Sequence, residues 1–350
     1  MSDAIHPYPA SDTVTAEQLA AARRGNEHEF SSLTEPYRYE LKVHCYRILG
    51  SLHEAEDMVQ ETLLRAWKRL DTYQGRASFR AWLYKIATNA CLDVLDRRRT
   101  RRLLPENARP VSDPTVPVAP PIAESVWLEP YPDEWLAKST SNPEARYTAV
   151  ESVSFAFLAA LQGLPPRQRA VLILRDVLDW PAREAADLLD LTTSAVNSAL
   201  HRARVTLAEH YHGEVPEHLD QSEADERTQQ ILERYVHAWE AADVVGLVAL
   251  LKEDAAFSMP PSPSWYSGQE SIRIFVGQTV FADQGMFSGK AIGRWRLEYT
   301  RANGHPAFAL YQRTEDGTYQ AFGLHVLHIM EGRIAEIISF IDPSLPPLFV

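Results

Sequence analysis

The chain has 350 residues, of which 45% are hydrophobic and 23% charged, so collagen-like, fully disordered and disulfide-scaffold classes are excluded. This length predicts two or three domains. The net charge of −12 argues against a nucleic-acid-binding protein, but the charge is uneven, since residues 214–350 carry −9 and residues 1–104 carry +2. Because the acidic excess lies in the C-terminal part, the net charge does not exclude nucleic-acid binding by the N-terminal part.

Membrane, metal and cofactor sites have no support in the sequence. No apolar stretch approaches the roughly 20 residues that a membrane span needs, so we expect a cytoplasmic protein without membrane contacts. Cys45 and Cys91 are too far apart for a CxxC metal pair, and each lies among apolar neighbours in a helical pattern. We expect two buried free thiols, no metal and no cofactor.

Apolar residues recur at helical spacing from residue 16 to residue 104, which predicts a helical bundle. One helix of this bundle spans the segment EAEDMVQETLLRAW, which begins at Glu54 and ends at Trp67. Its apolar stripe faces inward, and its other face is either a solvated surface or a binding surface. The residues of that outer face are Glu54, Asp57, Gln60, Glu61, Arg65 and Lys68.

This segment resembles region 2 of the bacterial sigma factors, where the pattern AEDxVQETFLRAW docks on the clamp helices of core RNA polymerase; Met58 and Leu64 depart mildly from it. Residues 71–99 look like the adjoining segment of the extracytoplasmic-function group, which melts DNA and reads the −10 element. Capture of unstacked bases needs aromatic faces beside cations. The resemblance implies −10 contacts by Tyr73, Arg76, Arg80, Trp82, Lys85, Asn89, Arg97, Arg98 and Arg99.

Two features of this segment have a second interpretation. Phe79 shares the apolar stripe of Leu83 and Ile86, so we expect it to pack in the core. The basic cluster Arg97–Arg102 either contacts phosphates or is a solvated helix end, where positive charge is favourable.

Residues 105–143 contain nine prolines and no sustained period, which predicts an extended linker between independently moving domains. Helical spacing returns over residues 144–213 and predicts four short helices. The last two are separated by Asp190 and Leu191, with Thr192 as N-cap, which is typical of a helix-turn-helix.

This second helical domain is similar to sigma region 4, whose last helix enters the major groove at the −35 element. The resemblance also implies contact with the polymerase flap. Asn197 replaces a frequent Lys and Ala199 a frequent Arg, so we expect weakened or altered −35 recognition. The implied −35 contacts are Thr193, Ser194, Asn197, Ser198, His201, Arg202 and Arg204.

An acidic hinge (residues 214–226) precedes a third domain, residues 227–345, in which a helix is followed by strands of period two. It resembles the SnoaL-like branch of the nuclear-transport-factor-like cone fold, with helices on a curved antiparallel sheet. Candidate residues for a small-molecule pocket are Trp265, Tyr266, Trp295, Tyr311, Phe322 and His325. The favoured interpretation of any single one of them is a place in the hydrophobic core.

Together these patterns predict two all-α domains and an α+β cone. The resemblance implies an extracytoplasmic-function sigma factor that binds core RNA polymerase and promoter DNA and has no catalytic residue. We expect the C-terminal domain to modulate activity, in either direction, through intramolecular contact with the sigma domains. The alternative is a SnoaL-like enzyme or ligand sensor fused to a helix-turn-helix regulator; His325 and His328 are its candidate residues, but no acidic partner lies nearby in sequence.

Overall fold

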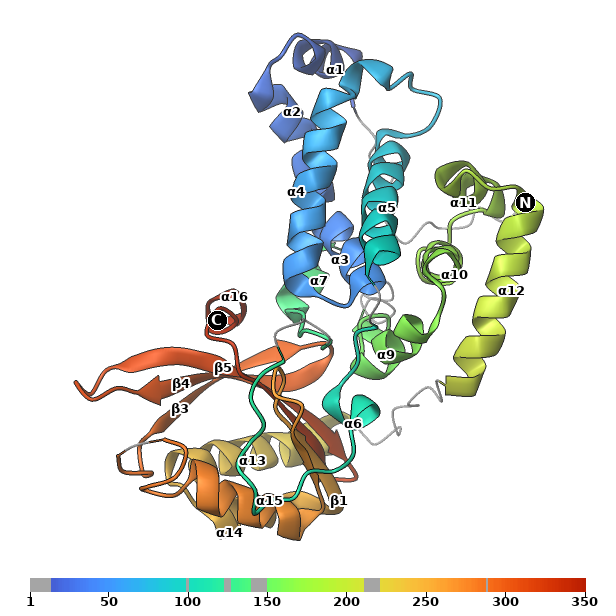
Figure 1. The fold of residues 1–350 in the computed structure, drawn as a ribbon. Coiled ribbons are helices and arrows are strands. Elements are labelled where there is room, and N and C mark those ends of the chain that lie inside the picture. The colour runs from blue at the N-terminus through green and yellow to red at the C-terminus, as the bar shows by residue number, and fades with distance from the viewer. Residues whose placement is uncertain (1–13, 99–100, 123–126, 140–149, 211–220, 288) are drawn as a thin grey trace. The chain divides into compact units, whose positions relative to one another are not determined.

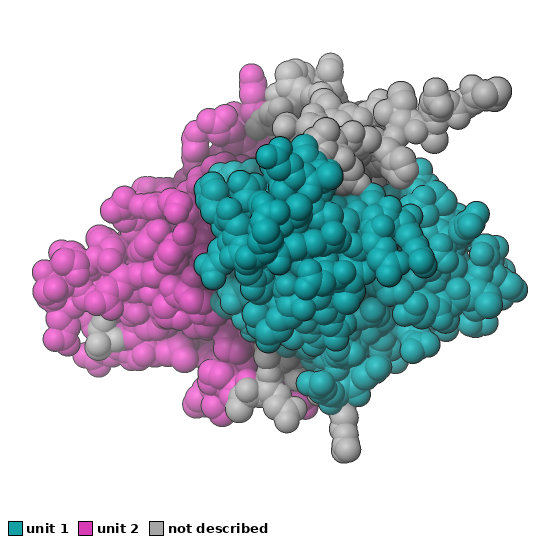
Figure 2. All heavy atoms as spheres, turned by 90° about the horizontal axis from the view of Figure 1, so that it is seen from above, with its two compact units in different colours: residues 1–102, 128–213 teal, residues 103–127, 214–350 magenta. Residues whose placement is uncertain are grey.

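The computed structural model describes residues 14–98, 101–122, 127–139, 150–210, 221–287 and 289–350. The chain forms two compact units (Figure 2). The first, the helical unit, comprises residues 1–102 and 128–213, and the second, the sheet unit, comprises residues 103–127 and 214–350. Both units are therefore built from segments that are separated in the sequence.

The N-terminal half of the helical unit is the predicted bundle (Figure 1). Its long helices pack through apolar stripes, and in α4 the stripe consists of Leu52, Ala55, Val59, Thr62, Leu63 and Ala66. The helices are α1 (Ala16–Arg23), α2 (Glu27–Thr34), α3 (Arg38–Leu49), α4 (Leu52–Lys68) and α5 (Phe79–Arg97), with single 3₁₀ turns at Glu35–Tyr37 and Leu70–Thr72.

Two residues make the sharp reversal between α3 and α4. Gly50 ends α3 in the left-handed region with φ 71°, and a Cβ there would lie 2.6 Å from the Leu128 side chain. Ser51 caps α4, because its Oγ accepts a hydrogen bond from the Glu54 amide at 3.1 Å. The start of α4 is thereby fixed against residues from the predicted linker.

The C-terminal half of the helical unit holds the helix-turn-helix. Thr192 accepts a hydrogen bond from the Ala195 amide at 3.1 Å, which confirms the predicted cap. The helices are α7 (Asp133–Ser139), α9 (Phe155–Gly163), α10 (Pro166–Leu172) with a π turn at Ile173–Val177, α11 (Ala182–Leu189) and α12 (Thr193–His210).

The two halves are not separate bodies, in contrast to the independent domains that the sequence predicts. Arg169 is 3% exposed and donates to the Ile48 carbonyl at 2.6 Å and to Gln162 Oε1 at 2.8 Å. Burial lowers the pKa of this guanidinium to about 9. Arg47 donates to Ser152 Oγ at 2.7 Å. Buried polar bonds of this kind join the halves into one unit.

The sheet unit is built on a six-stranded sheet with the order β2-β1-β6-β5-β4-β3 (Figure 1). Neighbouring strands are antiparallel, as predicted, except for β1 and β6, which are parallel. The strands are β1 (Leu251–Ser258), β2 (Trp265–Ser267), β3 (Trp295–Ala302), β4 (His305–Arg313), β5 (Tyr319–Met330) and β6 (Arg333–Phe340).

Helices cover one face of this sheet and enclose an aromatic core (Figure 1). The helix at residue 221 begins inside the predicted acidic hinge, so part of that hinge is helical. The helices of this unit are α6 (Pro105–Ala108), α13 (Gln221–Glu240), α14 (Val244–Val248), α15 (Gln269–Phe275) with a π turn at Val276–Val280, and α16 (Pro346–Phe349).

Candidate nucleic-acid interface

The outer face of α4 combines polar side chains with one exposed leucine. Asp57, Gln60 and Lys68 are exposed, as predicted for a surface helix. Leu64 is 47% exposed and lies on the same helical row, three or four residues from its neighbours. Leu64 thus adds apolar area to a polar face, and it was absent from the predicted contacts because the sequence alone does not show whether a leucine is buried.

Two other residues of the predicted polymerase-binding face are held by ion pairs. Arg65 donates to Glu61 at 2.6 Å and to Asp93 of α5 at 3.1 Å, and these carboxylates raise the pKa of Arg65. Arg65 and Glu61 remain partly exposed, so they stay at the rim of the face. The Arg65–Asp93 pair joins α4 to α5.

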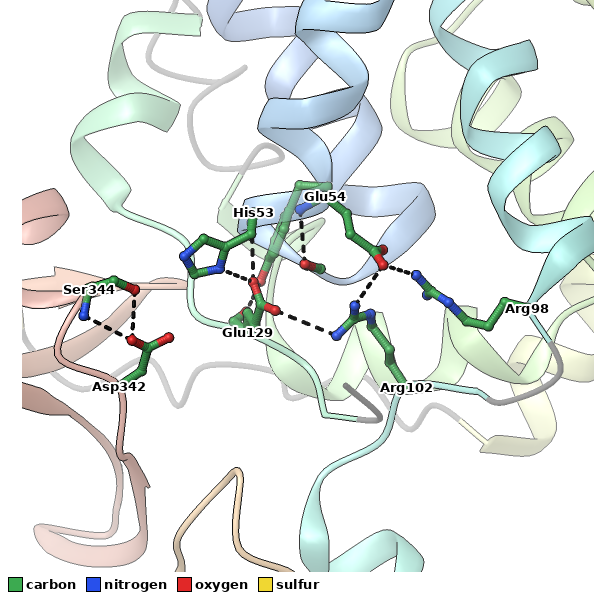
Figure 3. Close-up of polar contacts among 9 residues, drawn as sticks. His53, Glu54, Arg98, Arg102, Glu129, Asp342 and Ser344 are labelled. Carbon is green, nitrogen blue, oxygen red and sulfur yellow. Dashed lines mark hydrogen bonds and ion pairs between the residues drawn. The ribbon is translucent and has the colours of Figure 1, made fainter. Parts of the chain in front are cut away.

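Glu54 instead belongs to an ion cluster at the base of the bundle (Figure 3). Its Oε1 accepts hydrogen bonds from Arg98 and, at 3.0 Å, from Arg102. Arg102 is 1% exposed and also lies 3.6 Å from Glu129, which accepts from His53 at 2.9 Å. Glu54, Arg98 and Arg102 therefore have ion-pair partners within the chain.

Glu129 stays ionised within this cluster. Its burial by itself raises the pKa, but the hydrogen bonds from His53 and the charge of Arg102 outweigh burial and leave the pKa below its ordinary value. A buried carboxylate with these partners fixes the end of α5 and the segment after residue 128.

An aromatic cluster lies at the N-terminal end of α5. The Tyr73 ring lies 5.2 Å from Trp82 and 5.4 Å from Phe79. Phe79 is 1% exposed, which confirms that it packs in the core. Trp82 is half-buried and Arg76 exposed. Both border a pocket of about 550 Å³, and such a pairing of aromatic face and cation suits an unstacked base.

Two of the remaining predicted −10 residues are engaged by other parts of the helical unit. Arg80 lies 2.9 Å from the Glu40 carboxylate and over the Tyr84 ring, so its guanidinium is engaged within the helical unit. Lys85 is bonded to α11 of the same unit. Asn89 is half-buried on α5, and Arg97 is exposed at the C-terminal end of α5. Arg99 lies outside the described residues.

The N-terminal half of α12 presents a polar face. Ser194, Asn197, Ser198, His201 and Arg202 line one shallow hollow, and Thr193 is exposed beside them. Arg204 points elsewhere and pairs with Asp176 at 2.7 Å, so it is not part of this face. Ala199 is buried, which explains why a small residue stands at that position.

If Asn197 reads an adenine edge, Asn197→Ala lowers affinity for the best −35 sequence about tenfold, because one bidentate base contact contributes about 1–3 kcal/mol of discrimination. Val205→Ala, an exposed change two turns further along α12, is the matched control. Binding of both variants to duplex −35 DNA in the presence of core polymerase checks this. Equal affinity of wild type and Asn197→Ala would contradict it.

The predicted ligand-pocket residues lie on several strands of the sheet unit. Trp295 and Phe322 pack edge to face at 4.9 Å, and His325 lies 4.5 Å from the Trp239 ring. Tyr266 stacks on the α15 ring of Phe275 at 4.2 Å. Tyr311 is half-buried on β4, and Trp265 is on the edge strand β2. Most of these side chains build the aromatic core.

His325 is fully buried, and Tyr235 Oη lies 2.9 Å from its Nδ1. Burial lowers the pKa of His325 to about 3. Among the partners that the described residues supply to His325, none is a carboxylate. A general-base pair is therefore not assembled around it.

The low pKa of His325 predicts acid sensitivity. The unfolded chain takes up the proton near pH 6.5 and the folded chain only near pH 3, so this group's contribution to stability is complete above pH 6.5 and falls as the pH drops. Between these values the free energy of unfolding changes by about 1.4 kcal/mol per pH unit. The free energy of unfolding of the sheet unit, measured with urea at several pH values, should depend less steeply on pH in the double variant Tyr235→Phe, His325→Phe. The difference in slope corresponds to the uptake of one proton on unfolding. An unchanged slope would contradict this.

The first part of the predicted linker is bound to the sheet unit. We call residues 103–122 together with Trp127 the strap. Ser112 donates from its amide to the Trp265 carbonyl at 2.9 Å, and the Ala119 amide donates to Ser264 Oγ at 3.0 Å. Trp127 is 4% exposed, and its Nε1 donates to the Pro261 carbonyl at 2.9 Å.

Apolar contact adds to these bonds. Val118 packs against the aromatic core of the sheet unit, while Val116 beside it is 56% exposed. The strap runs along the loop that leads into β2, an edge strand of the sheet. The expected free linker is thus replaced over this range by a docked segment.

Within the described ranges, no group of three metal-ligating side chains comes together and no helix is long and apolar enough to cross a membrane. Cys45 and Cys91 are both buried and free, as expected.

Comparison with known proteins gives three matching families. The models for sigma-70 region 2, sigma-70 region 4 and the SnoaL-like domain match residues 33–102, 154–207 and 232–337. The ECF RNA polymerase sigma factor SigG of Mycobacterium tuberculosis (strain H37Rv) is 44% identical over 96% of this chain and 86% of its own length.

A second curated relative and a solved structure agree with this. The ECF RNA polymerase sigma factor SigJ of the same strain is 27% identical over 64% of this chain and 62% of its own length. The crystal structure of Mycobacterium tuberculosis SigJ superposes with a TM-score of 0.54 at 21% identity, and covers 89% of this chain and 96% of that one. The structural likeness shows a shared fold.

Proposed function

Because the chain belongs to the extracytoplasmic-function sigma factors of RNA polymerase, we propose that α4, α5 and α12 supply its contacts with core polymerase, the −10 element and the −35 element. The protein directs core polymerase to specific promoters, and it carries a C-terminal SnoaL-like domain. We place it in the cytoplasm, where polymerase and promoter DNA are, and assign it no catalytic residue.

The polymerase contact is the row of exposed residues on α4. Leu64 supplies apolar area at its centre, and Asp57, Gln60 and Lys68 surround it with polar groups. An interface with an apolar centre and a polar rim has this composition. The observation that carries the proposal is the exposure of Leu64 within the helix that matches sigma region 2. The clamp helices of core polymerase are the proposed partner surface, with the flap as partner of the region 4 half.

The promoter contacts divide between two surfaces. Tyr73, Arg76 and Trp82 form the proposed −10 surface, to which Lys85, Asn89 and Arg97 add polar and basic groups along α5. The hollow along α12 is the −35 surface, where Asn197 and Ser194 face base edges and Arg202 faces phosphate. We leave Arg80 and Arg98 out of these surfaces because both side chains are mostly buried against a carboxylate, and Arg204 because it pairs with Asp176 and does not line the hollow along α12. Lys85 is kept because its side chain is more exposed than those of Arg80 and Arg98.

We propose that the SnoaL-like domain modulates activity through the strap. The strap belongs to the connection between the −10 and −35 halves, and backbone and side-chain hydrogen bonds fix it to residues 261–265. Holding part of this connection shortens the length of chain that is free to span the two promoter elements. This gives the C-terminal domain control over promoter engagement without a ligand.

Val118→Asp tests this role. A carboxylate placed against the aromatic core weakens the docking of the strap, whereas Val116→Asp places the same charge in solvent. We expect faster proteolysis of residues 103–122 and a changed transcript yield for Val118→Asp, with Val116→Asp unchanged in both. A released strap with an unchanged transcript yield would contradict the regulatory role.

An enzyme fused to a DNA-binding regulator is the alternative function. It receives little support, because His325 is buried against Tyr235 and its neighbours are aromatic rings rather than an acid–base pair. Core-dependent transcription from a promoter library separates the two functions. A sigma factor yields a promoter-specific transcript only when core is added, whereas a regulator of the alternative kind binds duplex DNA specifically without core.

A further inference from the structure

Two parts of the helical unit that are assigned to different promoter elements are bonded to each other. Helix α11 packs against α5. Lys85 of α5 donates from Nζ to Asp190 Oδ1 at 2.7 Å and to the Asp187 carbonyl at 2.9 Å. The Lys85 ammonium, a proposed −10 contact, therefore donates two hydrogen bonds to the C-terminal end of α11.

Asp190 has an unusual backbone for a residue with a side chain. It ends α11 in the left-handed region, with φ 54° and ψ 45°, where glycine is favoured. Its amide donates to the Ala186 carbonyl, which any residue could do. The carboxylate is what an aspartate adds at this place, and that carboxylate bonds Lys85.

Side chains of opposite charge lie on facing walls of the pocket beside this pair. One wall of the 550 Å³ pocket is the −10 surface, with Tyr73, Arg76 and Trp82. The facing wall comes from the region 4 half and contributes Trp180, Glu184, Asp187 and Leu188. An acidic helix thus faces the basic and aromatic side chains that are proposed to hold single-stranded DNA.

This arrangement is incompatible with binding both promoter elements at once. Elements at −10 and −35 are separated by about 25 base pairs, or about 85 Å at 3.4 Å per pair. In the structure, Lys85 on the −10 surface contacts Asp190, and α12 begins only three residues after Asp190. The two DNA-reading surfaces must therefore separate when both elements are engaged.

We propose that α11 is an internal competitor of the non-template strand, and that the Lys85–Asp190 ion pair biases the free protein toward this closed state. The inference rests on the −10 assignment of Lys85 and Trp82 in the proposed function. The side chains of the pair are 36% and 74% exposed, so the bond is salt-sensitive and acts as a bias that binding can overcome. The Tyr84–Trp180 ring contact at 5.2 Å adds an apolar component.

Asp190→Gly removes the carboxylate and suits the left-handed backbone, so the helical unit keeps its fold. Asp179→Gly is a matched control. Asp179 is also an exposed aspartate with positive φ (51°) in the same half of the unit, and Lys85 does not contact it. Both variants lose the same charge and the same backbone strain, so only the loss of the ion pair distinguishes them.

Two measurements on the full-length chain test the inference. Dyes at Glu27→Cys and Val205→Cys report the distance between the halves, because the native thiols Cys45 and Cys91 are buried. Fluorescence anisotropy reports binding of a single-stranded DNA oligonucleotide of mixed sequence. For Asp190→Gly we expect a longer distance and about two- to fivefold tighter DNA binding at low salt, with both differences lost at high salt. Asp179→Gly should match the wild type.

An unchanged distance, or a longer distance without tighter DNA binding, would overturn the inference. Core-dependent transcription by the same proteins separates this failure from a failure of the proposed function. If specific transcripts appear while Asp190→Gly behaves as wild type in both assays, the sigma function stands and the internal competitor is rejected. If no protein directs a transcript, the proposed promoter contacts fail.

Discussion

Leu64→Asp should lower the affinity for core polymerase thirtyfold or more, because it places a charge at the centre of the proposed interface, where a central residue contributes about 2 kcal/mol or more. Leu64 is 47% exposed, so the change leaves the bundle core intact. Binding of labelled protein to purified core polymerase measures the loss.

Val245→Asp is the control for this change. Val245 is 78% exposed on α14 of the sheet unit, outside every proposed contact with polymerase or DNA. It should bind core as the wild type does. Equal affinity of Leu64→Asp and Val245→Asp would show that α4 is not the polymerase-binding surface.

Trp82→Ala should reduce open-complex formation about 10- to 100-fold, since one base–aromatic stack contributes about 1–3 kcal/mol. The affinity for core should stay unchanged, because Trp82 belongs to α5 and is not part of the exposed row of α4. Trp82→Phe keeps an aromatic face against Tyr73 and should recover most of the activity.

Permanganate reactivity of unpaired thymines around −10, measured with core present, reports this step. Normal reactivity for Trp82→Ala would contradict the assignment of the aromatic cluster to base capture. We expect reduced reactivity for Trp82→Ala and nearly normal reactivity for Trp82→Phe.

Periodic features of the chain were predictable from sequence. The turn of the helix-turn-helix follows from Asp190, Leu191 and the capping Thr192. Strand β5 (Tyr319–Met330) lies in the third domain, where strands were predicted. The family assignment of the chain also followed from these motifs, because region 2 and region 4 occur in order.

Pairings between distant residues were not predictable. Glu129 lies in a proline-rich stretch without a period, and nothing in its neighbourhood indicates that it meets Arg102. Arg204 has the spacing of a DNA contact but reaches Asp176, which comes from a different helix. The strap docks through irregular backbone bonds, which leave no repeating pattern of apolar residues. Charge and proline content alone therefore predicted a solvated basic cluster at Arg97–Arg102 and a free linker over residues 105–143.

In vitro transcription from a promoter library with purified core polymerase tests the central claim most directly. The full-length wild-type chain should direct promoter-specific transcripts only when core is present, and Leu64→Asp should abolish them while Val245→Asp preserves them. If the wild-type chain yields no core-dependent transcript, or if Leu64→Asp transcribes as well as the wild type, the assignment of α4 as the contact that brings this protein to polymerase is wrong.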